Sequence, residues 1–143
     1  MSRKSELFLI DIIIAIDKLY RYAKEFENGE ALLHDEKTWD ATIREFEIIG
    51  EATKQLIRTE TFDLKWQIVV DFRNMIIHEY FGIDPDEVFD IIKNDLESFE
   101  EYIKETIKIY DKNDFLQLLE SAIEDNKYNK NIVSMLNQLK QDI

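Results

Sequence analysis

The chain has 143 residues, of which 45% are hydrophobic and 34% charged, a composition typical of one globular domain and not of a disordered segment. Three Gly and one Pro leave few tight turns, which disfavours a β-rich fold, and the absence of Cys excludes disulfides, thiolate zinc sites and cysteine nucleophiles. The formal net charge of −13 disfavours broad adhesion to nucleic acid, although cations gathered in one cleft would still permit a nuclease.

The first predicted helix runs from about Ser5 to Glu27, where Asn28-Gly29 supplies a C-terminal cap signal. Its apolar run "LFLIDIIIAI" is interrupted by Asp11 and is about half the ~20 residues that a membrane span requires. We therefore expect a cytoplasmic protein with no membrane partner. Nine of the ten residues from Leu7 to Ile16 are hydrophobic, more than one buried stripe needs. This excess predicts a homodimer, unless the C-terminal segment covers it.

The second predicted helix starts around Asp35 and extends to Ile57. Gly50 lies in its interior at a cost of about 1 kcal/mol relative to Ala, which predicts the close approach of a neighbouring helix. Glu51, the next residue, has two candidate partners. It could orient Arg73 from the neighbouring helix, or form an ion pair with Lys54 within its own helix.

The third predicted helix covers roughly Leu64 to Tyr80, and the fourth begins at Asp84 and extends to Tyr110. Asp84 is the expected N-cap, Pro85 occupies the first helical position, and Glu87 completes a capping box. Two shorter amphipathic segments follow, at 115–125 and 131–141. The sequence thus predicts an all-α bundle over residues 1–110 with a helical C-terminal extension over residues 111–143.

The third helix gathers four hydrogen-bonding side chains at its C-terminal end, Arg73, Asn74, His78 and Tyr80. At about 100° of rotation per residue, Arg73 and Tyr80 share a face, and so do Asn74 and His78. Arg73 and His78, however, lie about 140° apart around an ideal helix. A joint Arg–His site therefore needs a distorted helix end, the reach of the arginine side chain, or a second copy of the helix across a two-fold axis.

These residue types suit phosphodiester chemistry on RNA. An arginine offers a fork of donors to a phosphate, and a histidine can accept a proton from a ribose 2′-hydroxyl or give one to the leaving oxygen. RNA supplies its own nucleophile, so no metal or other cofactor is required. The structural alternative is that His78 caps the helix and Arg73 pairs with Asp71 or Glu79.

The segment "FRNMIIHEYFGID" resembles the R-x4-H-x-Y signature of HepT-like proteins, a branch of the HEPN superfamily. The stretches "FEIIGEATKQL" (46–56) and "VFDIIKNDLESFEEYI" (88–103) are also similar to the family, as is the position of Trp66, seven residues before Arg73. The resemblance covers about residues 5–108. Phe89 stands where the family often has Trp, which affects no catalytic position.

The resemblance implies a HEPN-type four-helix up-and-down bundle that acts as the toxin of a toxin–antitoxin system. It implies a homodimeric, metal-independent ribonuclease with Arg73 and His78 as catalytic residues and Asn74 in support. The implied partner is an MntA-like minimal nucleotidyltransferase antitoxin that transfers AMP from ATP to Tyr80. The rival hypothesis is a non-catalytic helical module that binds substrate for, or regulates, a minimal nucleotidyltransferase, and the net charge of −13 favours it slightly.

Overall fold

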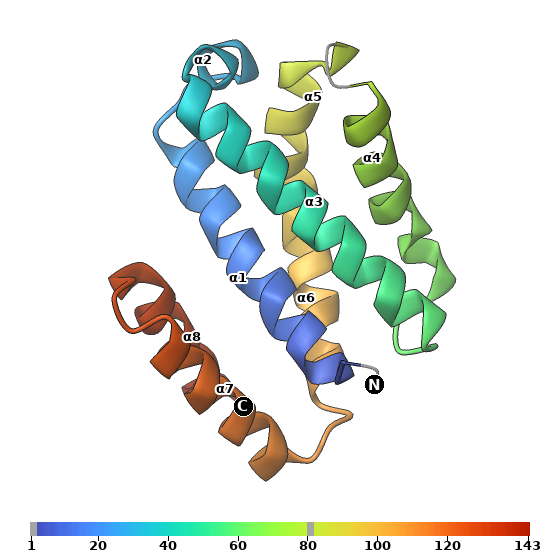
Figure 1. Ribbon diagram of the computed structural model, residues 1–143, viewed down its shortest axis with the longest axis vertical. Helices are drawn as coiled ribbons and strands as arrows, with labels where there is room; N and C mark the ends of the chain where they lie inside the picture. The colour runs from blue at the N-terminus through green and yellow to red at the C-terminus, as the bar shows by residue number, and fades with distance from the viewer. Residues whose placement is uncertain (1–2, 80–81) are drawn as a thin grey trace.

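The computed structural model describes residues 3–79 and 82–143, and these form an all-α fold, as the sequence predicts. Helices α1 (Ser5–Lys24), α3 (Glu36–Arg58) and α4 (Gln67–His78) make three arms of a bundle. The fourth arm is one continuous rod, in which α5 (Pro85–Asp90) passes through a π-helical turn, η3 (Ile91–Asp95), into α6 (Leu96–Ile107). Successive arms run in opposite directions (Figure 1).

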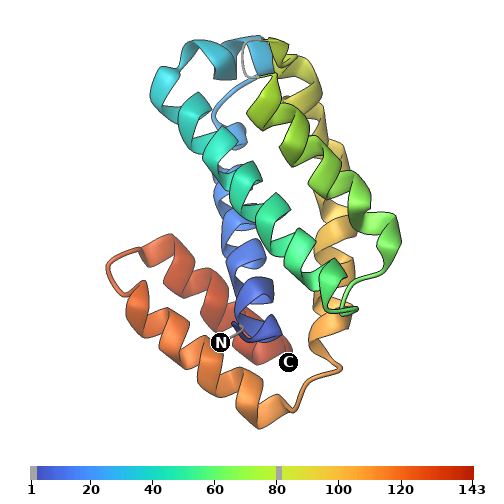
Figure 2. The same ribbon diagram turned by 45° about the vertical axis from the view of Figure 1, so that its right-hand side comes forward.

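Helix α1 is enclosed on nearly all sides. It packs on α3, on η3 and α6, and on the hairpin of α7 (Lys112–Asp125) and α8 (Lys130–Asp142). Figure 2 shows this hairpin lying across the N-terminal half of α1. The buried side of α1 comprises Leu9, Ile10, Ile12, Ile13, Ala15, Ile16, Leu19 and Ala23. The C-terminal helices therefore cover the apolar excess that the sequence could also assign to a dimer, and α1 gives no support for dimerisation.

The link between α1 and α3 differs from the sequence prediction. Helix α1 ends at Lys24, and Asn28-Gly29 begins a short helix, α2 (Gly29–His34), instead of capping α1. The Asn28 side chain accepts a hydrogen bond from the Ala31 N–H at 2.8 Å, a typical N-cap. Gly29 sits so close to α5 that a Cβ there would lie 2.1 Å from the Pro85 carbonyl oxygen. Helix α2 thus closes one end of the bundle against α5.

Helices α3 and α4 are joined by a short 3₁₀ turn, η1 (Leu64–Trp66). Asp35 caps α3 by accepting a hydrogen bond from the Thr38 N–H at 3.1 Å. Helix α4 ends at His78, two residues before the predicted end, because Glu79 leaves the helical region at φ −120° and ψ 40°. Tyr80, the predicted last residue of this helix, lies outside the described residues.

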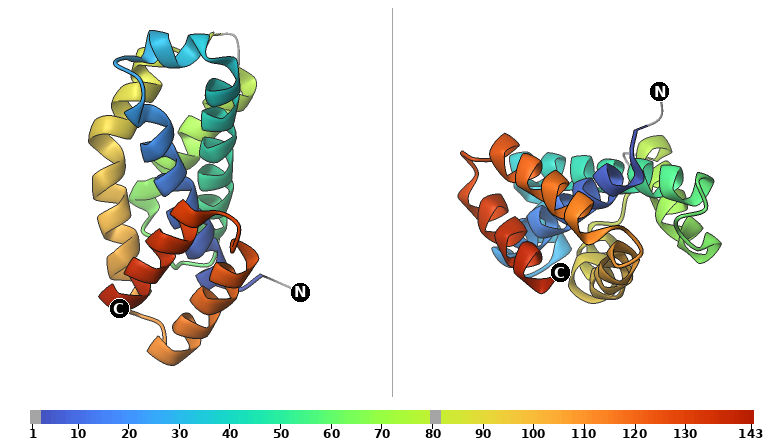
Figure 3. Two further views of the ribbon diagram at one scale, coloured as in Figure 1. Left: turned by 90° about the vertical axis from the view of Figure 1, so that its left-hand side faces the viewer. Right: turned by 90° about the horizontal axis from the view of Figure 1, so that it is seen from below.

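The rod of α5 and α6 starts as the sequence predicts, with Asp84 as the N-cap and Pro85 in the first turn. The Asp84 carboxylate accepts from the Asp86 N–H at 2.9 Å, so the cap does not reach Glu87 as the predicted capping box requires. Figure 3 shows the rod running alongside α1, with the α7–α8 hairpin near the N-terminal end of α1. Within the described ranges, no helix is long and apolar enough to cross a membrane.

Candidate active site on helices α3 and α4

Arg73 is placed by the tightest contact between α3 and α4. Gly50 on α3 is buried directly beneath it, and a Cβ added there would lie 2.2 Å from Cβ of Arg73 and 2.4 Å from its Cγ. The predicted close approach at Gly50 is confirmed, since only a residue without a side chain leaves room for this crossing. This packing contact positions Cβ and Cγ of Arg73 independently of the polar interactions of its guanidinium.

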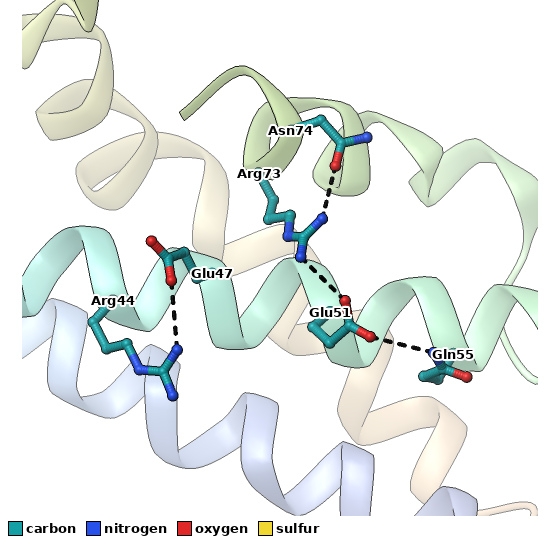
Figure 4. Close-up of polar contacts among 6 residues, drawn as sticks. All are labelled: Arg44, Glu47, Glu51, Gln55, Arg73 and Asn74. Carbon is teal, nitrogen blue, oxygen red and sulfur yellow. Dashed lines mark hydrogen bonds and ion pairs between the residues drawn. The ribbon is translucent and has the colours of Figure 1, made fainter. Parts of the chain in front are cut away.

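The guanidinium of Arg73 has two neighbours (Figure 4). Nη2 donates to Oε2 of Glu51 at 3.3 Å, and Nη1 donates to Oδ1 of Asn74 at 2.9 Å. The other carboxylate oxygen of Glu51 accepts from Nε2 of Gln55 at 3.3 Å. The Arg73 side chain is 25% exposed and that of Glu51 49% exposed, so the ion pair lies at the surface and is partly open to solvent. These bonds hold the guanidinium in one orientation.

This geometry decides between the partners that the sequence left open for Arg73. Glu51 of the neighbouring helix takes the guanidinium, while Asp71 instead accepts a hydrogen bond from Gln67 at 3.1 Å. Gln55 is a member of the cluster that the sequence interpretation missed. Its only signal is the four-residue spacing from Glu51, which places both side chains on one face of α3.

His78 is the last residue of α4, and its side chain is exposed. Its imidazole makes no hydrogen bond or ion pair with any other residue of the described ranges. Because α4 is regular from Gln67 to His78, the predicted rotation of about 140° keeps His78 away from the Arg73 face. One copy of the chain therefore brings Arg73, Asn74 and Glu51 together but does not bring His78 to them.

The surroundings supply no obvious metal ligands. Residues 3–79 and 82–143 contain no group of three or more His, Asp or Glu side chains that could hold a metal ion. What the cluster offers is an oriented guanidinium that is partly open to solvent, together with an imidazole at the nearby helix end. These are groups for binding an anion and for transferring a proton.

Tyr80 is the predicted modification site, and it lies outside the described residues. The described chain resumes at Gly82, whose N–H donates to the Glu79 carbonyl oxygen at 2.8 Å. His34, the other histidine of the chain, ends α2 and forms an exposed pair with Glu30 at 3.0 Å, far along the chain from the Arg73 cluster.

Comparison with known proteins finds a family model described as "Ribonuclease HepT-like" matching residues 12–106. A protein named "Putative RNase" from Methanocaldococcus jannaschii is 35% identical over 68% of this chain and 86% of its own length. A "Probable ribonuclease HepT" from Thermococcus cleftensis is 34% identical over 68% of this chain and 91% of its own length.

A longer relative from M. jannaschii, named "Gamma-glutamylcyclotransferase and putative RNase", is 28% identical over 90% of this chain. This chain spans only 54% of that protein. No solved structure matches the chain. The family match ends at residue 106, before the α7–α8 hairpin, which begins at Lys112.

Proposed function

This chain belongs to the HepT-like ribonuclease family, and from that premise we propose that it is a metal-independent endoribonuclease acting as the toxin of a toxin–antitoxin system. The observation that supports this best is the oriented guanidinium of Arg73, held by Glu51 and Asn74 near the helix end that carries His78. Membership of the family supports ribonuclease activity in general, and the chemistry of Arg73 and His78 suggests them as the catalytic groups.

In the proposed reaction, the ribose 2′-oxygen attacks the adjacent phosphorus as a base removes its proton. The bond from phosphorus to the 5′-oxygen breaks, and that oxygen receives a proton from an acid, which leaves a 2′,3′-cyclic phosphate and a 5′-hydroxyl. Arg73 stabilises the charge on the phosphate oxygens, and His78 transfers the proton. Asn74 supports Arg73 through the hydrogen bond at 2.9 Å.

The site as proposed needs two copies of the chain, because one copy leaves Arg73 and His78 on different faces of α4. A two-fold axis beside the end of α4 would bring both residues of each copy into one cleft, where two His78 side chains can serve as acid and base. Ile77, next to His78, is 41% exposed and offers apolar surface for such a contact. Ile77→Glu is expected to give a monomer without ribonuclease activity, whereas Ile109→Glu, at a residue 69% exposed beyond α6, should change neither. A wild-type monomer by light scattering at micromolar concentration would contradict the shared cleft.

The catalytic roles are tested by cleavage of a fluorescent RNA with Arg73→Ala and His78→Ala, each compared with wild type at matched folding by circular dichroism. Both variants should lose cleavage, and both should fail to inhibit growth when expressed. Arg44→Ala is the control, because Arg44 is an exposed cation on α3 whose ion pair within the described residues is with Glu47, at 3.4 Å (Figure 4). Cleavage by His78→Ala at the wild-type rate would contradict the proposal.

We also propose that a partner MntA-like nucleotidyltransferase silences the protein by transferring AMP to Tyr80. Support comes from the family and from the sequence, which puts Tyr80 two residues beyond the end of α4 and seven after Arg73. The adduct would add a phosphate, an anion that could compete with RNA for an arginine of the proposed site. Tyr80→Phe should cut RNA normally yet escape inactivation by the partner and ATP. Full inactivation of Tyr80→Phe would mean that the partner inhibits by binding alone.

The rival function is a non-catalytic helical module that regulates a nucleotidyltransferase. Two observations favour it, the net charge of −13 and the neutralisation of Arg73 by Glu51. The same cleavage assay decides between them, because a regulatory module would leave RNA intact with wild-type protein as well as with His78→Ala.

A further inference from the structure

Helix α4 leaves an open groove between itself and the rod of α5, η3 and α6. It packs on α3 and on η1, while the rod of α5, η3 and α6 passes behind α3 in the view of Figure 1. The groove between α4 and this rod has a volume of about 580 Å³, within the range of roughly 300–1,000 Å³ typical of ligand sites.

The floor and the α4 side of this groove are apolar. Phe46 and Ile49 of α3 lie at its base, and both are buried. Val69 and Phe72 of α4 line one wall, and Ile68 stands at its lip with 67% of its surface exposed. The exposed side chain of Ile68 extends the apolar lining of the groove out to the protein surface. The hollow suits the apolar face of an amphipathic helix.

The opposite wall carries negative charge. Glu87, Asp90 and Asp95 line the groove from the α5–η3 side, and the lining includes no Lys or Arg. None of the three carboxylates forms an ion pair within the described part of the chain. Uncompensated carboxylates along one edge of an apolar groove attract a partner with basic residues beside its apolar face.

Two local features set this groove apart from ordinary packing. The wall that carries Asp95 is the π-helical turn η3, and single π-turns within helices are frequent at functional sites. Trp66, also in the lining, has its indole N–H buried with no acceptor among the described residues.

We propose that the α4–α6 groove is the docking site for a basic amphipathic helix of a partner protein. The apolar anchors of that helix, at a spacing of three, four and seven residues, would fill the space between Ile68 and Phe99. Its Lys or Arg residues would face Glu87, Asp90 and Asp95. A second copy of this chain is a poorer occupant, because the chain carries 31 acidic against 18 basic residues and its own surface would repel the acidic rim. This inference does not rest on the proposed catalysis.

The test is a display library of 20-residue helical peptides, with apolar residues fixed at amphipathic spacing and all other positions random, selected against the full-length protein. We expect the selected peptides to be rich in Lys and Arg flanking the apolar stripe. Binding measured by fluorescence anisotropy should weaken at least tenfold with Ile68→Glu and with the double variant Asp90→Lys/Asp95→Lys. The double variant should also gain affinity for peptides whose basic residues are replaced by Glu.

The matched control is Glu120→Lys/Glu124→Lys, which changes the net charge equally on exposed positions of α7 and should leave peptide binding within twofold of wild type. The proposal is overturned if no peptide is enriched, if the enriched peptides are acidic, or if both double variants weaken binding equally. It is also overturned if the protein self-associates through this face, shown by dimers that Ile68→Glu dissociates.

Discussion

Gly50 is the residue on which the geometry of the Arg73 cluster depends most directly. A methyl group there would lie 2.2 Å from Cβ of Arg73, far inside van der Waals contact, and neither helix backbone can yield without moving the other. The guanidinium bonds to Glu51 and Asn74 are surface interactions, and each is worth at most about 1 kcal/mol. Packing therefore places Arg73, and its polar partners only orient its end.

We predict that Gly50→Ala destabilises the protein and displaces the cluster. Ala gains about 1 kcal/mol in helix propensity over Gly, but overpacking of this kind costs typically about 1–3 kcal/mol, and the severity of the overlap places this case at the upper end. The expected net loss in free energy of unfolding is about 2 kcal/mol, measured by urea denaturation. The control is Gly82→Ala, where a Cβ meets nothing within 4 Å. Equal stability of the two variants would show that the helices are not in tight contact.

In the proposed reaction Glu51 would compete with an RNA phosphate for Arg73, and this gives a second prediction at the residue scale. Glu51→Gln keeps an oxygen that can accept from the guanidinium but removes the negative charge. The affinity for a non-cleavable 2′-O-methyl RNA, measured by fluorescence anisotropy, should rise by up to about fivefold, the equivalent of an exposed ion pair of about 1 kcal/mol.

The control for this prediction is Glu47→Gln, which removes the same charge from the same helix but from the pair with Arg44 (Figure 4). It should change the RNA affinity much less. If both variants tighten RNA binding equally, the effect comes from net charge and Arg73 has no special part in it.

The C-terminal hairpin matters at the scale of elements because it completes the core around α1. Phe115 and Leu119 of α7, and Leu136 of α8, are almost fully buried in the same hydrophobic cluster as Leu9 and Ile16. Without the hairpin, α1 would expose an apolar face. We propose that residues 111–143 are an integral cover of the bundle and not a separately folding domain.

We predict that Phe115→Ala lowers the free energy of unfolding by about 3–5 kcal/mol, the usual cost of removing a buried aromatic ring. Urea denaturation would measure it, with Tyr128→Ala as the control, since Tyr128 is 88% exposed and should change stability by less than about 0.5 kcal/mol. A loss below 1 kcal/mol for Phe115→Ala, or a separate unfolding step for the hairpin, would contradict an integral role.

The main helices were predictable because their periodicity and caps agree. The Asp84-Pro85 start is an example, since the cap residue and the proline favour the same boundary. Helix α2 was not predicted because Asn-Gly can either end one helix or begin the next. The close contact of Gly29 with Pro85 favours the helix start. No pattern in the sequence predicted the π-helical turn at Ile91–Asp95.

The candidate site was predictable in part for a similar reason. Gly50 in the interior of a helix predicted the close approach of a second helix, and Glu51 had two candidate partners, Arg73 and Lys54. Which pair forms depends on how α4 crosses α3, and sequence spacing within one helix does not contain that information. The groove beside Ile68 was not foreseen at all, because it arises from the separation of α4 and α6.

At the scale of the whole molecule, some of the 31 acidic side chains become partly buried when the chain folds. Burial raises the pKa of Glu45 above its ordinary value of 4.5, although Lys18 at 3.9 Å opposes this. Burial likewise raises the pKa of Glu100, with Lys104 in opposition. A raised folded-state pKa means that the folded protein binds these protons more tightly than the unfolded chain does.

We therefore predict that these two carboxyl groups stabilise the protein increasingly as the pH falls through their raised pKa values toward 4.5. The contribution of each group is fully present below pH 4.5 and is lost as the pH rises through the raised pKa. The lowered pKa of Asp35, caused by its hydrogen bond from the Thr38 N–H, acts with the opposite sign but only below its ordinary value of 3.8. The urea midpoint should rise less as the pH falls toward 4.5 in Glu45→Gln/Glu100→Gln than in the wild type. An unchanged slope in that variant would assign the pH dependence to other groups.

The most direct test of the proposed activity is the chemistry of the RNA ends that the wild-type protein produces in the presence of EDTA. A labelled oligonucleotide would be cut and its products analysed by mass spectrometry, beside an identical oligonucleotide with 2′-O-methyl groups throughout. The proposed mechanism predicts 2′,3′-cyclic phosphate and 5′-hydroxyl ends from the first and no cleavage of the second, because the nucleophile is the RNA's own 2′-hydroxyl and Arg73 and His78 supply the charge stabilisation and the proton transfer. Cleavage of the methylated strand, 5′-phosphate ends, or loss of activity in EDTA would contradict it.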